Sequence, residues 1–131
     1  MIENEEKIKV IIVDDSYDFI QGLLFYLEKE LNYSVIGIAS NGKELLEHPL
    51  LQEAEILLID CEMPIMNGIE TAINITKLYP HMLMIATTLY DENVYIEELL
   101  HVGFKGYVNK ADINKKLKIV MDYILNQKKL N

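Results

Sequence analysis

The 131-residue sequence contains one cysteine, three prolines and no tryptophan. Because Cys61 has no second cysteine to pair with, an internal disulfide is excluded, which fits the reducing cytoplasm. No segment is rich in glycine, serine or proline, so the chain offers no candidate linker and is expected to form one domain. The longest apolar run is far shorter than the roughly 20 residues that span a bilayer, and the charged N-terminus MIENEEKIKV does not suit a signal peptide. These absences favour a cytoplasmic protein that does not enter a membrane.

The charge balance is strongly acidic. Asp and Glu number 21 against 12 Lys and Arg, which gives a formal net charge of −9. A domain with this charge repels nucleic-acid phosphates, so we expect no direct nucleic-acid binding by this domain. Hydrophobic residues make up 50% of the chain, which is enough for a packed core and argues against disorder.

Short apolar runs alternate with longer segments whose apolar residues recur every three or four positions. The runs are typical of buried strands, and the spacing is typical of helices with one buried face. The expected strands are residues 7–13, 34–39, 55–59, 82–87 and 105–109. The expected helices include residues 19–31, 41–46, 68–78, 94–100 and 113–124, the last with Asp112 as its N-cap. The five strand–helix units predict the α/β class and a flavodoxin-like (βα)5 doubly wound sandwich, with a five-stranded parallel sheet in the order 2-1-3-4-5.

Polar side chains follow four of these five strands, at the edge where open parallel sheets bind ligands. They are Asp14 and Asp15 after the first strand, Asp60 after the third, Thr87 and Thr88 after the fourth, and Asn109 and Lys110 after the fifth.

The three aspartates need compensating charge if the first and third strands are neighbours. Two unit charges about 5 Å apart repel by about 3 kcal/mol at an effective dielectric constant of about 20. Lys110 offers one positive charge, and Mg²⁺, which binds carboxylate, water and phosphate oxygens, offers a second. Each aspartate alone would suit an ordinary loop or an N-cap better than a ligand site. Their joint placement with the lysine favours a Mg²⁺ site.

The segment LLIDCEMPIMNGIE, residues 57–70, closely resembles the signature of response regulator receiver domains. That signature is an apolar strand, Asp, two residues, Met-Pro and then Gly-x-Glu. VIIVDDS, TTLYDE and KGYVNKA resemble the family's acidic pair and its fourth and fifth strand endings, and the Thr-x-Tyr-Asp turn is similar to that of the NarL/LuxR-like branch. The resemblance implies a single receiver domain over residues 1–131, with a short N-terminal extension at residues 1–6 and no output domain in this chain.

The resemblance also implies the chemistry of the site. Asp60 is expected to be the phosphoacceptor, and Lys110 is expected to contact the phosphoryl oxygens. Asp15 and Asp60 are expected to bind Mg²⁺ directly, together with the backbone carbonyl of Glu62, while Asp14 acts through metal-bound water. These positions in the family mark a residue set for phosphoryl transfer to a carboxylate.

Two further residues are implied as a switch. Thr88 is expected to hydrogen-bond the phosphoryl group and to belong to the catalytic set, and Tyr107 is expected to move inward as Thr88 moves. Thr87 is the alternative to Thr88, because neighbouring strand residues point to opposite faces and only the family spacing favours Thr88. Tyr107 has the alternative role of a half-buried strand aromatic.

The implied function is signalling rather than metabolic catalysis. A sensor histidine kinase or a phosphotransfer protein would supply phosphate, with self-phosphorylation from small phosphodonors and autodephosphorylation as accompanying activities. The output, transcription through a DNA-binding domain absent from this chain, would follow a change of conformation. The basic last helix (Lys115, Lys116 and Lys118) is either a solvated surface or one half of a phosphorylation-dependent homodimer interface, opposite Glu97 and Glu98 of a second molecule.

Three other functions fit the sequence less well. A Mg²⁺-dependent phosphohydrolase would place aspartates at alternate positions after the first strand and would carry a cap insertion, whereas Asp14 and Asp15 are adjacent. A flavodoxin-like flavin protein needs a Ser/Thr/Gly-rich loop for the FMN phosphate, which this acidic pair would repel. A receiver-like scaffold that is never phosphorylated is the third alternative, and the full set of expected site residues counts against it.

Overall fold

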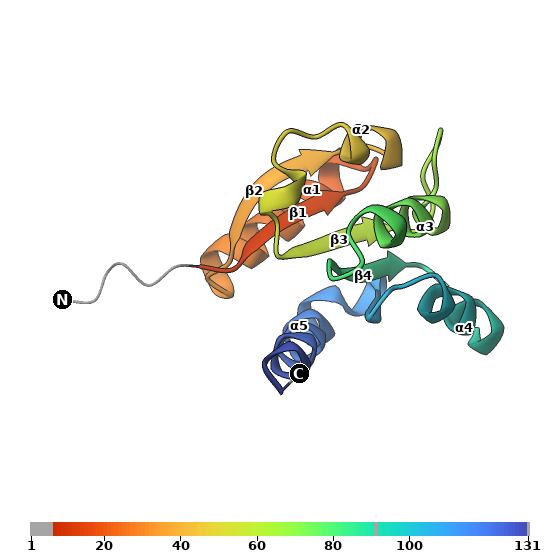
Figure 1. Cartoon of the computed structure of the whole chain (residues 1–131). Helices are drawn as coiled ribbons and strands as arrows, with labels where there is room; N and C mark the ends of the chain where they lie inside the picture. The colour runs from red at the N-terminus through yellow and green to blue at the C-terminus, as the bar shows by residue number, and fades with distance from the viewer. Residues whose placement is uncertain (1–6, 91, 131) are drawn as a thin grey trace.

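A five-stranded parallel sheet forms the centre of the computed structural model, which describes residues 7–90 and 92–130. The strands are β1 (Lys9–Val13), β2 (Ser34–Ala39), β3 (Ile56–Asp60), β4 (Leu83–Thr88) and β5 (Gly106–Asn109). Their order is β2-β1-β3-β4-β5, and every neighbouring pair is parallel (Figure 1). The predicted fold class and strand order are confirmed. The predicted extension at residues 1–6 lies outside the described residues.

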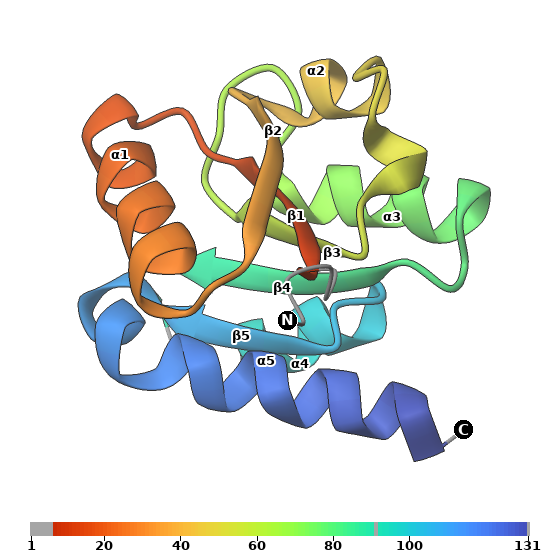
Figure 2. The same cartoon turned by 90° about the vertical axis from the view of Figure 1, so that its left-hand side faces the viewer.

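Helices connect the strands and cover both faces of the sheet (Figure 2). They are α1 (Tyr17–Phe25), α2 (Gly42–Leu46), α3 (Gly68–Leu78), α4 (Asn93–His101) and α5 (Ile113–Leu130). A π-helical turn, Tyr26–Glu30, continues α1, and short 3-10 turns lie at Leu51–Glu53 and Lys110–Asp112. Helices α1 and α5 pack on one face, and α2, α3 and α4 pack on the other. Among the described residues, no helix combines the length and the apolar character that a membrane span requires.

The central strands contribute side chains to two cores, because successive residues of a strand point to opposite faces. Ile11 and Val13 pack on the side of α2, α3 and α4, whereas Val10 and Ile12 pack toward α1 and α5. All five residues of β3 are buried. Each fully buried aliphatic side chain stabilises the fold by about 1.5–3 kcal/mol, so these runs hold the sheet between its helical layers.

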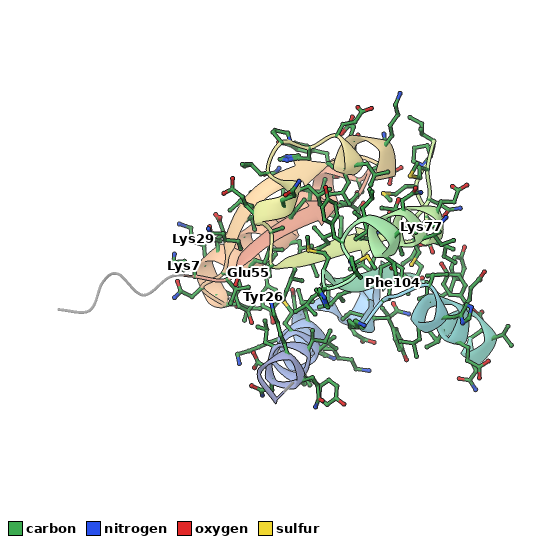
Figure 3. The ribbon with its side chains drawn as sticks, in the orientation of Figure 1. Lys7, Tyr26, Lys29, Glu55, Lys77 and Phe104 are labelled. Atoms are coloured by element: carbon green, nitrogen blue, oxygen red, sulfur yellow. The ribbon has the colours of Figure 1, made fainter. Side chains whose placement is uncertain are left out.

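Hydrogen bonds between distant segments hold the layers together. The hydroxyl of Tyr26 donates to the carbonyl of Asn114 at 2.9 Å, which joins the first helical segment to the start of α5. The backbone N–H of Lys9 donates to the carboxylate of Glu55 at 2.9 Å at the amino ends of β1 and β3, and Figure 3 labels Tyr26 and Glu55. The opposite edge, where the strands end, carries the candidate site.

The last helix begins after a capped 3-10 turn. Asp112, its predicted N-cap, is the last residue of the turn and directly precedes α5, and its capping role stays a prediction. The turn itself is capped by Asn109, whose Oδ1 accepts a hydrogen bond of 2.9 Å from the backbone N–H of Ala111 at the end of β5. As a result, Lys110 is the first residue of a capped turn and leaves the strand in a fixed direction.

Candidate functional site

The site lies at the carboxyl ends of β1 and β3, the two adjacent strands where the strand order reverses. Val13 pairs with Ala39 on one side and with Ile59 on the other. The chain then leaves β1 toward α1 on one face and leaves β3 toward α3 on the opposite face. Such a switch point opens a crevice in which parallel sheets bind ligands. Asp14 follows β1 directly, and Asp60 is the last residue of β3.

Three aspartate side chains meet in this crevice. One carboxylate oxygen from each of Asp14, Asp15 and Asp60 lies within 4.8 Å of the others. Asp14 and Asp60 are each only 1% exposed, whereas Asp15 is exposed to solvent. Backbone N–H groups hold the two buried carboxylates, because Ser16 donates to Oδ1 of Asp14 at 2.9 Å and Glu62 donates to Oδ1 of Asp60 at 3.2 Å.

Lys110 supplies the positive charge between the buried carboxylates. Its Nζ lies 2.9 Å from Oδ2 of Asp14 and 3.3 Å from Oδ2 of Asp60. The ammonium group therefore forms ion pairs with both buried carboxylates. The ring of Phe19 in α1 lies on another side of the ammonium group, with its centroid 4.5 Å from Nζ, which is within the range of a cation–π contact.

Burial and neighbouring charges shift the pKa values of both Asp60 and Lys110 upward overall. Burial first, and then the charge of Asp14, raises the pKa of Asp60 to about 6, although the N–H of Glu62 and the charge of Lys110 act against this. Burial alone would lower the pKa of Lys110, but hydrogen bonding and charge from Asp14 and Asp60 raise it overall. Lys110 therefore stays positive, while the pKa of Asp60 is raised despite the neighbouring lysine.

The donor set fits a hard divalent cation. Three carboxylates face one ammonium group, so the described site has an excess of negative charge. Apart from the ammonium group of Lys110, the buried Oδ2 of Asp14 has no hydrogen-bond donor among the described residues, which leaves a lone pair for a cation or for its bound water. Oxygen ligands of this kind, with one exposed carboxylate beside two buried ones, suit Mg²⁺.

The loop from β3 to α3 closes tightly over Asp60. The N–H of Gly68 donates to the carbonyl of Cys61 at 3.1 Å, and a Cβ atom on Gly68 would lie 2.6 Å from the carbonyl oxygen of Asp60. Asn67 and Glu70 then start α3 with a reciprocal capping box. The glycine is required by this close approach, and the loop fixes the backbone around Asp60 and Glu62.

Thr88 lies at the end of β4 and does not contact Asp60 in this structure. Its hydroxyl donates to Oε2 of Glu62 at 3.2 Å and accepts a hydrogen bond of 3.0 Å from the N–H of Tyr90. Thr87 is buried and pairs in register with Asp60. Tyr107 on β5 is partly exposed. The switch roles of Thr88 and Tyr107 remain predictions.

The structure thus brings Asp14, Asp15, Asp60 and Lys110 together, and their chemical roles also remain predictions. The Glu62 backbone N–H holds Asp60, whereas its side chain binds Thr88 and Tyr95, a contact that the sequence did not predict. Tyr95 precedes the buried Leu99 by four residues, so helical spacing would have placed it on the inner face of α4. The spacing of Phe19 indicated a core position but not its contact with Lys110.

Known proteins with a similar sequence or structure share the site-bearing part of the chain. A family model described as "Response regulator receiver domain" matches residues 10–121. The transcriptional regulatory protein DegU of Brevibacillus brevis is 28% identical over 107 residues, covering 82% of this chain and 45% of DegU. A protein-glutamate methylesterase/protein-glutamine glutaminase of Clostridium acetobutylicum is 32% identical over 124 residues, covering 93% of this chain and 36% of that protein. The chain therefore spans less than half the length of these two relatives.

A solved structure has a similar fold. The crystal structure of a LuxR-family two-component response regulator from Aurantimonas sp. SI85-9A1 matches with a TM-score of 0.86 at 20% identity. The match covers 93% of this chain and 87% of that one.

Proposed function

This chain belongs to the response regulator receiver domain family, and we propose that its Asp60 accepts a phosphoryl group from the phosphohistidine of a sensor histidine kinase or of a phosphotransfer protein. A carboxylate oxygen of Asp60 forms the new P–O bond while the P–N bond of the donor breaks, which leaves an aspartyl phosphate. The observation that carries the proposal is the position of Asp60. It is a buried carboxylate at a strand end, 3.3 Å from the ammonium group of Lys110 and grouped with two further aspartates.

The remaining site residues compensate the charges of this transfer. Asp15, Asp60 and the backbone carbonyl of Glu62 would hold a Mg²⁺ ion directly, and Asp14 would act through metal-bound water. When bound, the ion neutralises charge on the carboxylate and on the phosphoryl oxygens. Lys110 contacts a phosphoryl oxygen, and its raised pKa keeps it charged for that contact. The cluster of oxygen ligands, in which three carboxylates share one ammonium group, supports this arrangement.

The aspartyl phosphate then changes the conformation of the domain. A phosphoryl group brings a charge of about −1.5 to −2 and new hydrogen-bond acceptors. Thr88, one strand away, donates its hydroxyl to a phosphoryl oxygen, and Tyr107 moves inward as Thr88 moves. The two packed states already exist in equilibrium, and phosphorylation shifts their populations.

The role of the chain is signalling. We assign residues 1–131 to one receiver domain, and the relatives named as transcriptional regulators support control of transcription through a DNA-binding domain outside this sequence. The net charge of −9 supports an output that does not involve direct contact between this domain and nucleic acid. The kinase as donor implies a cytoplasmic location, and a phosphorylation-dependent homodimer is the expected form of the output.

The test is modification by a small phosphodonor. We expect acetyl phosphate with Mg²⁺ to add one phosphoryl group to the intact protein, as detected by mass spectrometry, and EDTA to prevent it. Asp60→Asn should abolish the modification, whereas Asp18→Asn, an exposed aspartate in the first turn of α1, should leave it unchanged. Equal modification of the Asp60→Asn variant would remove the proposal, and sustained turnover of p-nitrophenyl phosphate would point to a phosphohydrolase instead.

A further inference from the structure

One carboxylate oxygen of Glu62 connects three segments around the site. Glu62 lies in the loop after β3, two residues beyond Asp60. Its Oε2 accepts a hydrogen bond of 3.2 Å from the hydroxyl of Thr88, at the end of β4, and one of 3.0 Å from the hydroxyl of Tyr95, in the first half of α4. We call these two hydrogen bonds the Glu62 contact. It joins the residue expected to read the phosphoryl group to the helix that follows it.

Tyr95 is a suitable donor in this contact. Burial first, and then the neighbouring Cys61 and Glu62, raises the pKa of Tyr95, so its hydroxyl keeps the proton that it donates. The ring of Tyr95 packs edge to face on Tyr90, with the two centroids 6.1 Å apart and an interplanar angle of 87°. Tyr90 in turn donates its backbone N–H to Thr88, so the β4–α4 segment is tied to the same cluster.

The start of α4 has few other attachments. Its N-cap residue, Glu92, makes no side-chain capping hydrogen bond, and Leu99 is the one buried residue of the helix. By comparison, α3 has a full capping box and buries four residues, including Ala72 and Ile75. A helix with few attachments among the described residues depends on each of them, and the Glu62 contact lies in its first half, where Tyr95 and Ile96 are only partly buried against the core.

We propose that Glu62 is a positioning residue that holds α4 in its resting position through Tyr95 and competes with the aspartyl phosphate for the hydroxyl of Thr88. The inference rests on the proposed function of Asp60. A threonine hydroxyl has one hydrogen to donate, so Thr88 bonds either Glu62 or a phosphoryl oxygen. When Thr88 turns to the phosphoryl group, the Glu62 contact loses one of its two bonds and α4 loosens.

Thermodynamic linkage predicts the direction in which this competition changes the affinity of the site for a phosphoryl mimic. A contact that exists only in the resting form makes the switched form less favourable by the free energy of that contact. Removing the contact therefore strengthens binding of an anion that stabilises the switched form. A net hydrogen bond of ordinary strength corresponds to about a threefold to tenfold change in an equilibrium constant. The Glu62 contact therefore lowers the affinity of the site for a phosphoryl mimic.

The test combines two variants with beryllofluoride, a mimic of the aspartyl phosphate, in the presence of Mg²⁺. Tyr95→Phe removes the donor hydroxyl without changing charge, and Glu62→Ala removes the acceptor but leaves the backbone carbonyl in place. Tyr123→Phe, at a mostly exposed tyrosine of α5, is the matched control. Amide hydrogen exchange of α4 is measured without beryllofluoride, and the dissociation constant of beryllofluoride is measured by titration.

We expect both variants to exchange faster in α4 at rest and to bind beryllofluoride about threefold to tenfold more tightly, while Tyr123→Phe behaves like the unmodified protein. Because Tyr95 acts through Glu62, the double variant should match Glu62→Ala alone. If Tyr95→Phe changes neither exchange nor affinity, the inference is overturned, and a gain confined to Glu62→Ala would reflect charge alone. Failure of the unmodified protein to bind beryllofluoride would instead count against the proposed function, and the exchange at rest would still decide whether Glu62 holds α4.

Discussion

The ammonium group of Lys110 lies closer to Asp14 than to Asp60, at 2.9 Å against 3.3 Å. In the resting site, the lysine thus pairs chiefly with the carboxylate that is not expected to be phosphorylated. Asp60 retains a pKa raised to about 6 by burial and by Asp14, despite the presence of the lysine. Because the charge of Asp60 is not fully compensated, we expect the stability of the protein to depend on pH and on added cations, and both effects can be measured.

Replacement of Lys110 should destabilise the protein through its buried carboxylates. Removing one partner of a buried ion pair leaves an uncompensated charge, so we expect Lys110→Met to lower the free energy of unfolding by about 2–3 kcal/mol in EDTA at neutral pH. Lys116→Met is the control, because Lys116 and its partner Asp112 are 3.7 Å apart and both well exposed. That variant should lose less than about 0.5 kcal/mol. Equal losses in urea unfolding would mean that the central lysine carries no special electrostatic role.

The stability of the metal-free protein should fall as the pH rises from about 4 to about 6. Burial and Asp14 raise the pKa of Asp60 from 3.8 to about 6, so in this window the folded protein binds more protons than the unfolded chain. The free energy of unfolding therefore decreases with rising pH, by up to about 3 kcal/mol from this one group. Asp60→Asn should lack this decrease, and urea unfolding of both proteins in EDTA isolates it as a difference. Parallel curves across the window would show that Asp60 has an ordinary pKa.

Added Mg²⁺ should stabilise the protein through Asp15. A ligand at about 100 times its dissociation constant adds about 2.7 kcal/mol to the free energy of unfolding, which raises the melting temperature. Asp15 is exposed, so Asp15→Asn should change the stability little in EDTA while removing most of the response to Mg²⁺. Asp18→Asn, three residues away and also exposed, should keep the full response. A Mg²⁺ response that survives in Asp15→Asn would exclude this carboxylate as a ligand.

The sequence predicted the parts of the fold that depend on local patterns. Residues 10–13 and 56–59 are apolar at every position, which only strands buried on both faces require, and the structure has β1 and β3 there. Asp60 was placed correctly because it directly follows such a strand. The boundaries of α3 and the proline after it were predicted without error, whereas its capping box of Asn67 and Glu70 was not predicted.

The remainder depended on contacts that a linear pattern does not contain. Asn109 and Asp112 are both good capping residues three positions apart, and only the end of β5 decides that Asn109 caps the turn. Ile65 has φ of 68°, a left-handed conformation that β-branched residues rarely adopt, so residue propensity did not predict the shape of its loop. Glu62 lies in the same loop and bonds Thr88 and Tyr95, which are 26 and 33 residues away in the sequence, so no local pattern predicted this contact.

Gly68 should tolerate no side chain, because the loop over Asp60 has no space for one. A Cβ atom there would lie 2.6 Å from the carbonyl oxygen of Asp60 and 2.7 Å from Cα of Cys61, and both are backbone atoms. We expect Gly68→Ala to lower the free energy of unfolding by about 1–3 kcal/mol and to slow modification by acetyl phosphate, because the backbone of Asp60 must shift. Gly22→Ala is the matched control, since a Cβ on this exposed glycine of α1 meets nothing within 4 Å and should stabilise the helix by about 0.5–1 kcal/mol. Urea unfolding and phosphorylation kinetics measure both effects. If Gly68→Ala were as stable and as readily phosphorylated as Gly22→Ala, the loop would not fix the position of Asp60.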